Sequence, residues 1–251
     1  MTTYTKQQGV GYSISIAIAL TNYILKEFII AVTDFEAHHT RTDKEASTTS
    51  KIWIVQFFAT AIILTLINAN WSNVVTLPPT FPILQGTYPD FTARWYSQIG
   101  ATIVTTVFIN VIMPAIDLLD WCTAGCSRCC DRGCSFDKRK TKRFLQSDYE
   151  RVYTGLPQLF TVRYAMIIAT WFMIMLYSLA MPFLYFAGIF IYTSLYWVDK
   201  TLFVKFYKSP PRYDTAITRR VFFLLEFGII LHFMMGIYMV SNPDAFEFSS
   251  S

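Results

Sequence analysis

The chain has 251 residues, of which 53% are hydrophobic and 15% are charged, and its formal net charge is +4. Soluble domains carry about 25% charged residues, so this composition argues against a water-soluble globule and indicates a membrane protein. The small net charge gives no nucleic-acid footprint, and the sequence holds no Gly-rich phosphate loop, His-rich metal motif or Ser-His-Asp set. We therefore expect no enzyme, no cofactor and no nucleic-acid partner.

Apolar stretches recur along the chain, each close to the roughly 20 residues that a helix needs to cross the hydrocarbon core of a bilayer. They lack the two-residue alternation of a membrane barrel, so we expect helices. Residues 164–206 are too many for one crossing, and Pro182 predicts a turn between two helices there; one kinked helix is the alternative. The sequence thus predicts a single all-α domain over residues 1–251, a polytopic transmembrane helical bundle with about six spanning helices at residues 10–32, 52–69, 95–119, 164–181, 183–206 and 221–240.

Basic residues lie in every second gap between these stretches, and Lys and Arg are retained on the cytoplasmic side of a membrane. We therefore expect three gaps on the cytoplasmic side, namely 34–51, 121–151 and 207–220. The gap 121–151 is a Cys-rich and basic loop. The gap 70–94 has one basic residue and four prolines and is expected outside, where Asn70 opens an Asn-Trp-Ser glycosylation triplet. Both termini are expected outside, no signal peptide is recognised, and the protein is expected in the plasma membrane or an endomembrane.

Residues 32–58 read VTDFEAHHTRTDKEASTTSKIWIVQFF. This stretch resembles the anoctamin pattern in which one helix ends in LTxxExHRTxxxxExSLTxK and the next opens with FxFQFxN, although His39 and Thr49 stand near the family's Arg and Leu. A second stretch, from Asp148-Tyr149-Glu150 to Trp197-Val198-Asp199-Lys200, resembles the seventh and eighth helices of the superfamily, which also includes the OSCA and transmembrane channel-like (TMC) proteins. The resemblance implies helices four to nine of that fold. The N-terminal part and the last helix are then missing, and the chain looks like a fragment or a reduced relative.

The resemblance also implies a function. Members of the superfamily move ions, phospholipids or both along a groove or pore in each subunit, usually of a dimer. We therefore expect passive ion conduction with phospholipid scrambling beside it, a homodimer, and the lipid bilayer and ions as partners. Of the family's intramembrane calcium positions, Asp199 keeps a carboxylate and Asn110 an amide, so opening by membrane tension is a better model than calcium gating. The alternative is a non-conducting structural membrane subunit or fragment that retains the fold.

Polar groups inside a membrane are costly, so they call for partners, a wet cavity or a position near the interface. Asn110 lies four residues before Pro114, where a kink is expected, and it either lines a pore or makes an interhelical hydrogen bond. His232 is expected to be a packed, hydrogen-bonded histidine. The pore or gating candidates are Asn110, Pro114, Glu27, Asn68, Gln98 and Asp199.

All five cysteines fall within residues 121–151, which are expected in the reducing cytosol, where disulfides are disfavoured. The Cys126-x-x-Cys129 spacing could start a zinc site with Cys130 and Cys134, but no second clean pair and no nearby His completes it. Palmitoylation and unmodified thiols are the alternatives. The palmitoylation candidates are Cys122, Cys126, Cys129 and Cys130, and the side chains expected to hold anionic lipid headgroups are Lys138, Arg139, Lys140, Lys142 and Arg143.

Overall fold

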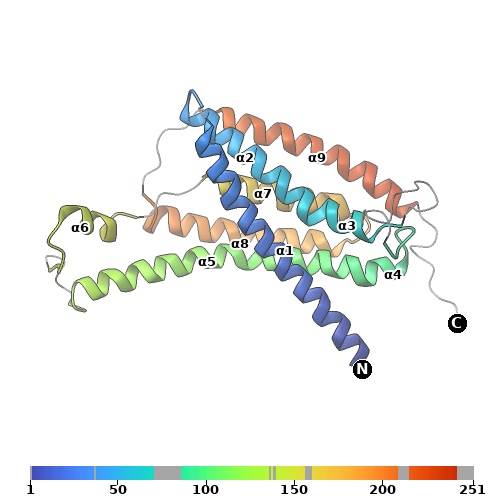
Figure 1. The fold of residues 1–251 in the computed structure, drawn as a ribbon, viewed down its shortest axis with the longest axis horizontal. Helices are drawn as coiled ribbons and strands as arrows, with labels where there is room; N and C mark the ends of the chain where they lie inside the picture. The colour runs from blue at the N-terminus through green and yellow to red at the C-terminus, as the bar shows by residue number, and fades with distance from the viewer. Residues whose placement is uncertain are drawn as a thin grey trace. The chain divides into compact units, whose positions relative to one another are not determined.

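The computed structural model describes residues 2–36, 38–70, 86–135, 137, 140–155, 160–208 and 215–241. Within these ranges the chain forms helices, turns and an isolated bridge between Ala69 and Tyr88, and it contains no strand (Figure 1). The predicted all-α fold class is confirmed.

Each expected helical stretch falls on a helix. The first is α1 (Thr2–Phe35). The second is a continuous run of α2 (Arg41–Phe57), the π-helical segment η1 (Phe58–Ile62) and α3 (Ile63–Asn68). The third is a similar run of α4 (Ala93–Trp95), the π-helical segment η2 (Tyr96–Gly100) and α5 (Ala101–Asp131). The last are α7 (Phe160–Tyr177), α8 (Phe183–Lys205) and α9 (Ala216–Val240), and a short α6 (Gln146–Tyr153) precedes them.

The turn between α7 and α8 lies where Pro182 predicts it. α7 ends at Tyr177, residues 178–182 are not helical, and α8 begins at Phe183, directly after the proline. Proline cannot supply the backbone N–H that a continuing helix needs, so the chain starts a new helix here. The predicted break of residues 164–206 into two helices is confirmed, and their crossing of the membrane as a hairpin stays a prediction.

Among the described residues, three helical runs are long and apolar enough to cross a membrane: Thr42–Asn68, Phe160–Tyr177 and Thr218–Val240. The count of about six crossings stays a prediction. α5 also continues well past residue 119, the expected end of its span, as far as Asp131. The segment 121–151 therefore begins as helix and ends within α6.

The start of α2 is set by Thr40. This residue has extended backbone, with φ −127° and ψ 152°, and its Oγ1 accepts a hydrogen bond from the backbone N of Asp43 at 3.1 Å. A threonine cap satisfies a donor at the start of the helix, and the Asp43 carboxylate favours the positive end of the helix dipole. The reversal between α1 and α2 is therefore encoded locally.

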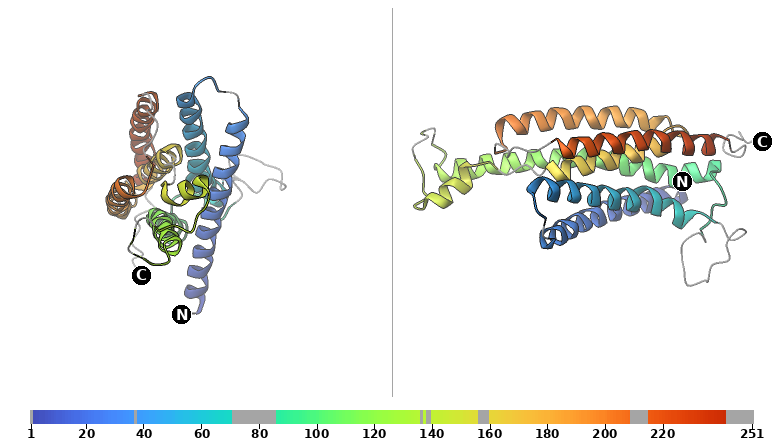
Figure 2. Two further views of the ribbon diagram at one scale, coloured as in Figure 1. Left: turned by 90° about the vertical axis from the view of Figure 1, so that its left-hand side faces the viewer. Right: turned by 90° about the horizontal axis from the view of Figure 1, so that it is seen from above.

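The chain divides into two compact units. The first unit comprises residues 1–109, 160–188 and 213–251, and the second comprises residues 110–159 and 189–212. In the first unit, α2 packs against α1, α7 and α9, and Trp53 stacks on Phe172 with ring centroids 4.8 Å apart. Figures 1 and 2 show α1 and α2 side by side, running in opposite directions. α2 is thus the central helix of the first unit.

α7 and α9 pack along a seam that repeats every four residues. A Cβ added at Gly228 would lie 2.0 Å from Trp171 Cζ3, and one added at Gly236 would lie 2.6 Å from Leu179 Cδ1. Small residues let helices approach closely, which is the common way to pack helices in a membrane. Trp171 and Met175 of α7, and Leu179 just beyond its end, pair in this order with Gly228, His232 and Gly236 of α9. Because residue numbers increase in the same direction on both sides of the seam, α7 and α9 run parallel.

Candidate functional site

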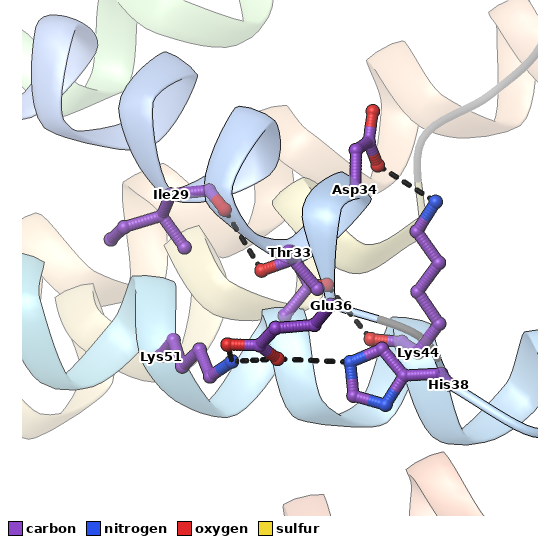
Figure 3. A network of polar contacts seen from close by, with 8 residues as sticks. Ile29, Thr33, Asp34, Glu36, His38, Lys44 and Lys51 are labelled. Carbon is purple, nitrogen blue, oxygen red and sulfur yellow. Dashed lines mark hydrogen bonds and ion pairs between the residues drawn. The ribbon is translucent and has the colours of Figure 1, made fainter.

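The turn between α1 and α2 carries a cluster of ion pairs (Figure 3). Lys51 Nζ lies 2.5 Å from Glu36 Oε2, and His38 Nε2 lies 3.0 Å from the same carboxylate. Lys44 Nζ lies 2.7 Å from Asp34 Oδ1. The hydrogen bond from Lys51 holds the pKa of Glu36 below its ordinary value, with a smaller effect of His38 in the same direction. These pairs join the end of α1 to the first turns of α2.

Other polar residues of the same stretch tie α2 to α7. Thr161 Oγ1 donates to Glu45 Oε2 at 3.0 Å, and Thr49 Oγ1 donates to the backbone O of Thr161 at 3.4 Å. Glu36 and Glu45 stand at the two Glu positions of the pattern that resembles the anoctamins. The stretch that carries the resemblance is therefore a junction between α1, α2 and α7.

The π-helical segment η1 forms a second polar junction. Asn22 Nδ2 on α1 donates to Thr60 Oγ1 at 2.8 Å, and Tyr177 Oη on α7 donates to the backbone O of Ala61 at 3.0 Å. Tyr177 Oη also lies 2.5 Å from Thr65 Oγ1. Thr60 and Tyr177 are buried, so these polar groups meet inside the apolar part of the first unit. Single π-helical turns occur frequently at functional sites.

Two of the pore candidates, Asn68 and Gln98, meet at Tyr88. The backbone N of Tyr88 donates to the backbone O of Asn68 at 3.1 Å, while Tyr88 Oη donates to Gln98 Oε1. The Asn68 side chain turns back onto its own helix, where Nδ2 donates to Leu64 O at 2.7 Å. Tyr88 is buried. The structure therefore gathers both candidates around a tyrosine that the sequence analysis did not single out.

The glycosylation candidate Asn70 lies beside the same tyrosine, because its backbone N donates to Tyr88 O at 2.7 Å. Its side chain is half-buried. Trp71 and Ser72, which complete the triplet, lie outside the described residues. Glycosylation of Asn70 stays a prediction.

The remaining pore candidates have other surroundings within their own units. Glu27 is exposed and lies 3.0 Å from Lys26 Nζ. Asn110 and Asp199 belong to the second unit, where both are half-buried and Asp199 has an interaction partner. α5 remains helical through Pro114. Their pore or gating roles stay predictions.

His232 joins three helices of the first unit. Its Nδ1 lies 2.6 Å from the backbone O of Met175 on α7, and its Nε2 lies 3.1 Å from Tyr185 Oη on α8. A carbonyl only accepts, so Nδ1 carries a proton, and the tyrosine hydroxyl can donate to Nε2 of a neutral imidazole. Both ring nitrogens are used, which confirms the expected packed and hydrogen-bonded histidine.

Asp131, the last residue of α5, organises the second unit. Its carboxylate accepts hydrogen bonds from Thr141 Oγ1 at 2.8 Å, Tyr153 Oη at 3.0 Å and the backbone N of Lys142 at 3.3 Å, and Arg143 Nε lies 3.6 Å away. The side chain is 1% exposed, covered by these partners rather than by a deep core. Asp131 thus fastens residues 141–143 and α6 to the end of α5.

Two arginines, Arg128 in the last turn of α5 and Arg132 directly after it, complete the junction with α6. Arg128 donates from Nε to Val152 O at 3.2 Å and from Nη2 to Tyr153 O at 3.4 Å. Arg132 Nε donates to Tyr153 Oη at 3.2 Å. A cation beside the last carbonyls of a helix is favourable. Of the lipid-headgroup candidates, Lys138 and Arg139 lie outside the described residues, and the exposed ones are Lys140, Lys142 and Arg143, for which the role stays a prediction.

The cysteines all have exposed free thiols. The part of the chain that the structure describes holds no group of three or more His, Cys, Asp or Glu side chains that could hold a metal ion. The zinc interpretation of Cys126, Cys129, Cys130 and Cys134 therefore gains no support. Cys129 Sγ instead lies 3.3 Å from Cys134 Sγ. Palmitoylation, including that of Cys122, stays a prediction.

Acidification is expected to loosen α6 through Asp131. Burial raises the pKa of Asp131, but hydrogen bonds from Thr141, Tyr153 and Lys142 outweigh it and hold this pKa below its ordinary value of 3.8. A carboxyl with a lowered pKa in the folded state stabilises the fold above its unfolded pKa, and this contribution is lost as the pH falls through the folded value.

We therefore expect the hydrogen-exchange protection of α6, corrected for intrinsic exchange, to fall below about pH 4. This acid-dependent step should disappear in Asp131→Asn. It should persist in Asp120→Asn, a control at an exposed carboxylate of the same helix. An identical acid profile in Asp131→Asn and the wild type would contradict the role of Asp131.

Comparison of the chain with protein-family models, with characterised proteins and with solved structures finds no match. The fold and the sites define the class: an all-α protein with apolar helices of membrane-crossing length, joined by buried polar junctions.

Proposed function

We propose that the chain is a multi-pass integral membrane protein of the channel type, similar to the anoctamin, OSCA and TMC proteins. In this proposal it conducts ions passively, scrambles phospholipids along the same path and catalyses no reaction. It acts in the plasma membrane or an endomembrane, as a homodimer, and opens with membrane tension.

The surface of α9 supports the membrane location. In the most apolar 18-residue stretch of Thr218–Val240, only 17% is buried against the rest of the chain. Water would make this exposure costly, at about 25 cal/mol per Å² of apolar surface, whereas lipid would not. The exposed aromatic and aliphatic side chains of α9 (red in Figure 1) include Phe222, Phe223, Phe227, Ile230, Phe233, Met234 and Ile237.

The polar group at Tyr88 is the observation that carries the conduction proposal. An ion that enters a bilayer needs oxygen or nitrogen groups in place of its hydration shell. The first unit holds such groups between apolar helices, with Gln98 bonded to Tyr88 and Asn22 bonded to Thr60. These contacts lie along the α2–η1–α3 run, which would form one wall of the conduction path.

A calcium-gated mechanism does not form part of the proposal. Calcium prefers six to eight oxygen ligands, several of them carboxylates. Asp199 and Asn110 are the positions of this chain that match the family's intramembrane calcium ligands, and they offer one carboxylate and one amide. Such a pair is too weak a ligand set for a calcium switch.

The test is transport by the purified protein in liposomes. We expect the wild type to release potassium or chloride above the rate of protein-free vesicles. We expect Gln98→Leu to reduce the rate about tenfold, since loss of one polar contact raises a barrier by about 1–2 kcal/mol. Asn110→Leu tests the second unit in the same assay. Bleaching of a labelled phospholipid by an external reductant measures scrambling.

Ser97→Leu is the matched control. Ser97 neighbours Gln98 in η2, is exposed, and its Oγ bonds its own helix at Arg94 O, 2.9 Å away. Its replacement should leave the rate unchanged. Equal rates in Gln98→Leu and Ser97→Leu would remove Gln98 from the path.

The second candidate function is a non-conducting structural membrane subunit or fragment. Two buried hydroxyls of α5 favour this alternative. Thr102 Oγ1 donates to Gln98 O and Thr106 Oγ1 donates to Thr102 O, both at 2.9 Å, so these hydroxyls donate to the backbone one turn earlier rather than to an ion path. A folded wild-type protein that moves neither ions nor lipids, with and without membrane tension, would establish this alternative.

A further inference from the structure

The end of α5 brings two cysteines together through its helix cap. Gly133 N donates to Cys130 O at 3.1 Å, and Cys134 N donates to Cys129 O at 2.8 Å. Gly133 has a left-handed backbone, with φ 63°. These are the two hydrogen bonds of the Schellman motif, in which the side chain beyond the cap contacts one in the last turn of the helix. Here both of those side chains are cysteines, and their sulfurs lie 3.3 Å apart.

The contact lies in a braced part of the chain. Cys134 has φ 57°, a left-handed conformation that residues with a side chain adopt only where their surroundings fix it. The same turn begins at Asp131, which Thr141 and Tyr153 hold by hydrogen bonds. The two sulfurs therefore meet because the backbone places them together.

We propose that Cys129 and Cys134 are a redox modification site and form a reversible disulfide that locks the cap of α5. A disulfide bond is about 2.0 Å long, so the sulfurs need to approach by about 1.3 Å from their contact at 3.3 Å. Both thiols are exposed and reachable by a small oxidant. In a reducing compartment such a disulfide is transient and senses redox state.

The oxidant is a small disulfide such as oxidised glutathione. The Cys129 thiol donates its S–H to Cys134 Sγ, an arrangement that raises the pKa of Cys129. Cys134 is therefore the first to attack: it loses its proton, forms a mixed disulfide and releases one glutathione. Cys129 then loses its proton, attacks Cys134 Sγ and releases the second glutathione. The protein thiols lose two electrons and two protons, and one glutathione disulfide becomes two thiols.

The test maps disulfides in the full chain, in detergent micelles equilibrated with mixtures of reduced and oxidised glutathione. Remaining thiols are alkylated, and trypsin then cuts after Arg128, Arg132 and Lys138. Peptides 129–132 and 133–138 stay joined only where a disulfide bridges them. As the share of oxidised glutathione is raised, we expect this joined pair to form before any other cross-link.

Serine variants assign the bond, because peptide 129–132 contains both Cys129 and Cys130. The joined pair should be lost in Cys129→Ser and in Cys134→Ser and retained in Cys130→Ser. Oxidation should also raise the hydrogen-exchange protection of residues 129–134 in the wild type and leave it unchanged in Cys134→Ser. Loss of the pair in Cys130→Ser, its persistence in Cys129→Ser, or cross-links formed first through Cys122 or Cys126 would overturn the proposal.

Discussion

Replacing Gly228 by leucine is expected to separate α9 from α7. A Cβ at this position would already lie 2.0 Å from Cζ3 and 2.8 Å from Cη2 of Trp171. An indole ring is rigid, so only a rotation of the whole Trp171 side chain or a shift of one helix makes room for the added side chain, and overpacking of this kind costs about 1–3 kcal/mol. We expect Gly228→Leu to lower the free energy of unfolding by about 3 kcal/mol. Thermal unfolding in detergent micelles, followed by circular dichroism, measures the change.

A second substitution separates the contact from a general effect of leucine. Trp171→Ala opens the space that the new side chain needs, so Gly228→Leu should cost less in that background, with a coupling of about 0.5–3 kcal/mol. Ile229→Leu, at the exposed neighbouring position, should cost under about 1.5 kcal/mol. If the losses of unfolding free energy in Gly228→Leu and Trp171→Ala simply added up in the double variant, residues 228 and 171 would not be in direct contact.

The helices were predictable because their signal is local. Runs of about 20 apolar residues mark the helices, and Pro182 marks the break between α7 and α8. The start of α2 at Arg41, within the gap expected at 34–51, was not predicted. The π-helical segments η1 and η2 were not predicted, because an extra residue shifts the phase of a helical pattern and such a shift cannot be seen in a run that is apolar on all sides. The continuation of α5 to Asp131 was also missed, since its last turns are polar and carry no apolar run.

The contacts of the candidate site depend on pairings that no single sequence displays. Gln98 and Asn68 were named for their polarity, but Tyr88, where they meet, lies in a connecting segment without periodicity. His232 was expected to be hydrogen-bonded, yet its partners lie in other helices, far away along the chain.

The cysteine pair shows the same limit at short range. The Cys126-x-x-Cys129 spacing drew attention in the sequence, whereas the structure pairs Cys129 with Cys134. The usable signal was Gly133, because a glycine after a polar helical end indicates a left-handed cap that folds the next side chain back.

Gly155→Ala is expected to have the largest local effect in the second unit. A Cβ at Gly155 would lie 1.6 Å from the backbone O of Phe206 and 2.8 Å from its backbone C. These are main-chain atoms just beyond α8, so no rotamer change relieves the clash and one of the two segments must move. We expect the free energy that holds α6 in place to fall by about 3 kcal/mol or more. Hydrogen exchange of residues 146–153, measured by mass spectrometry, reports the release of α6.

The same substitution at Gly125 supplies a control with the opposite sign. Gly125 lies within α5 in the same unit, and apart from its chain neighbours and the backbone of its own helical turns, no heavy atom of the described residues lies within 4 Å of a Cβ added there. An alanine in an exposed helix interior restricts the unfolded chain without strain, so Gly125→Ala should stabilise the helix by about 0.5–1 kcal/mol. If both variants shifted exchange in α6 equally, the effect would come from the unfolded state. Opposite shifts, with loss of protection confined to Gly155→Ala, would instead identify the close approach of Gly155 to Phe206 as the contact that seats α6.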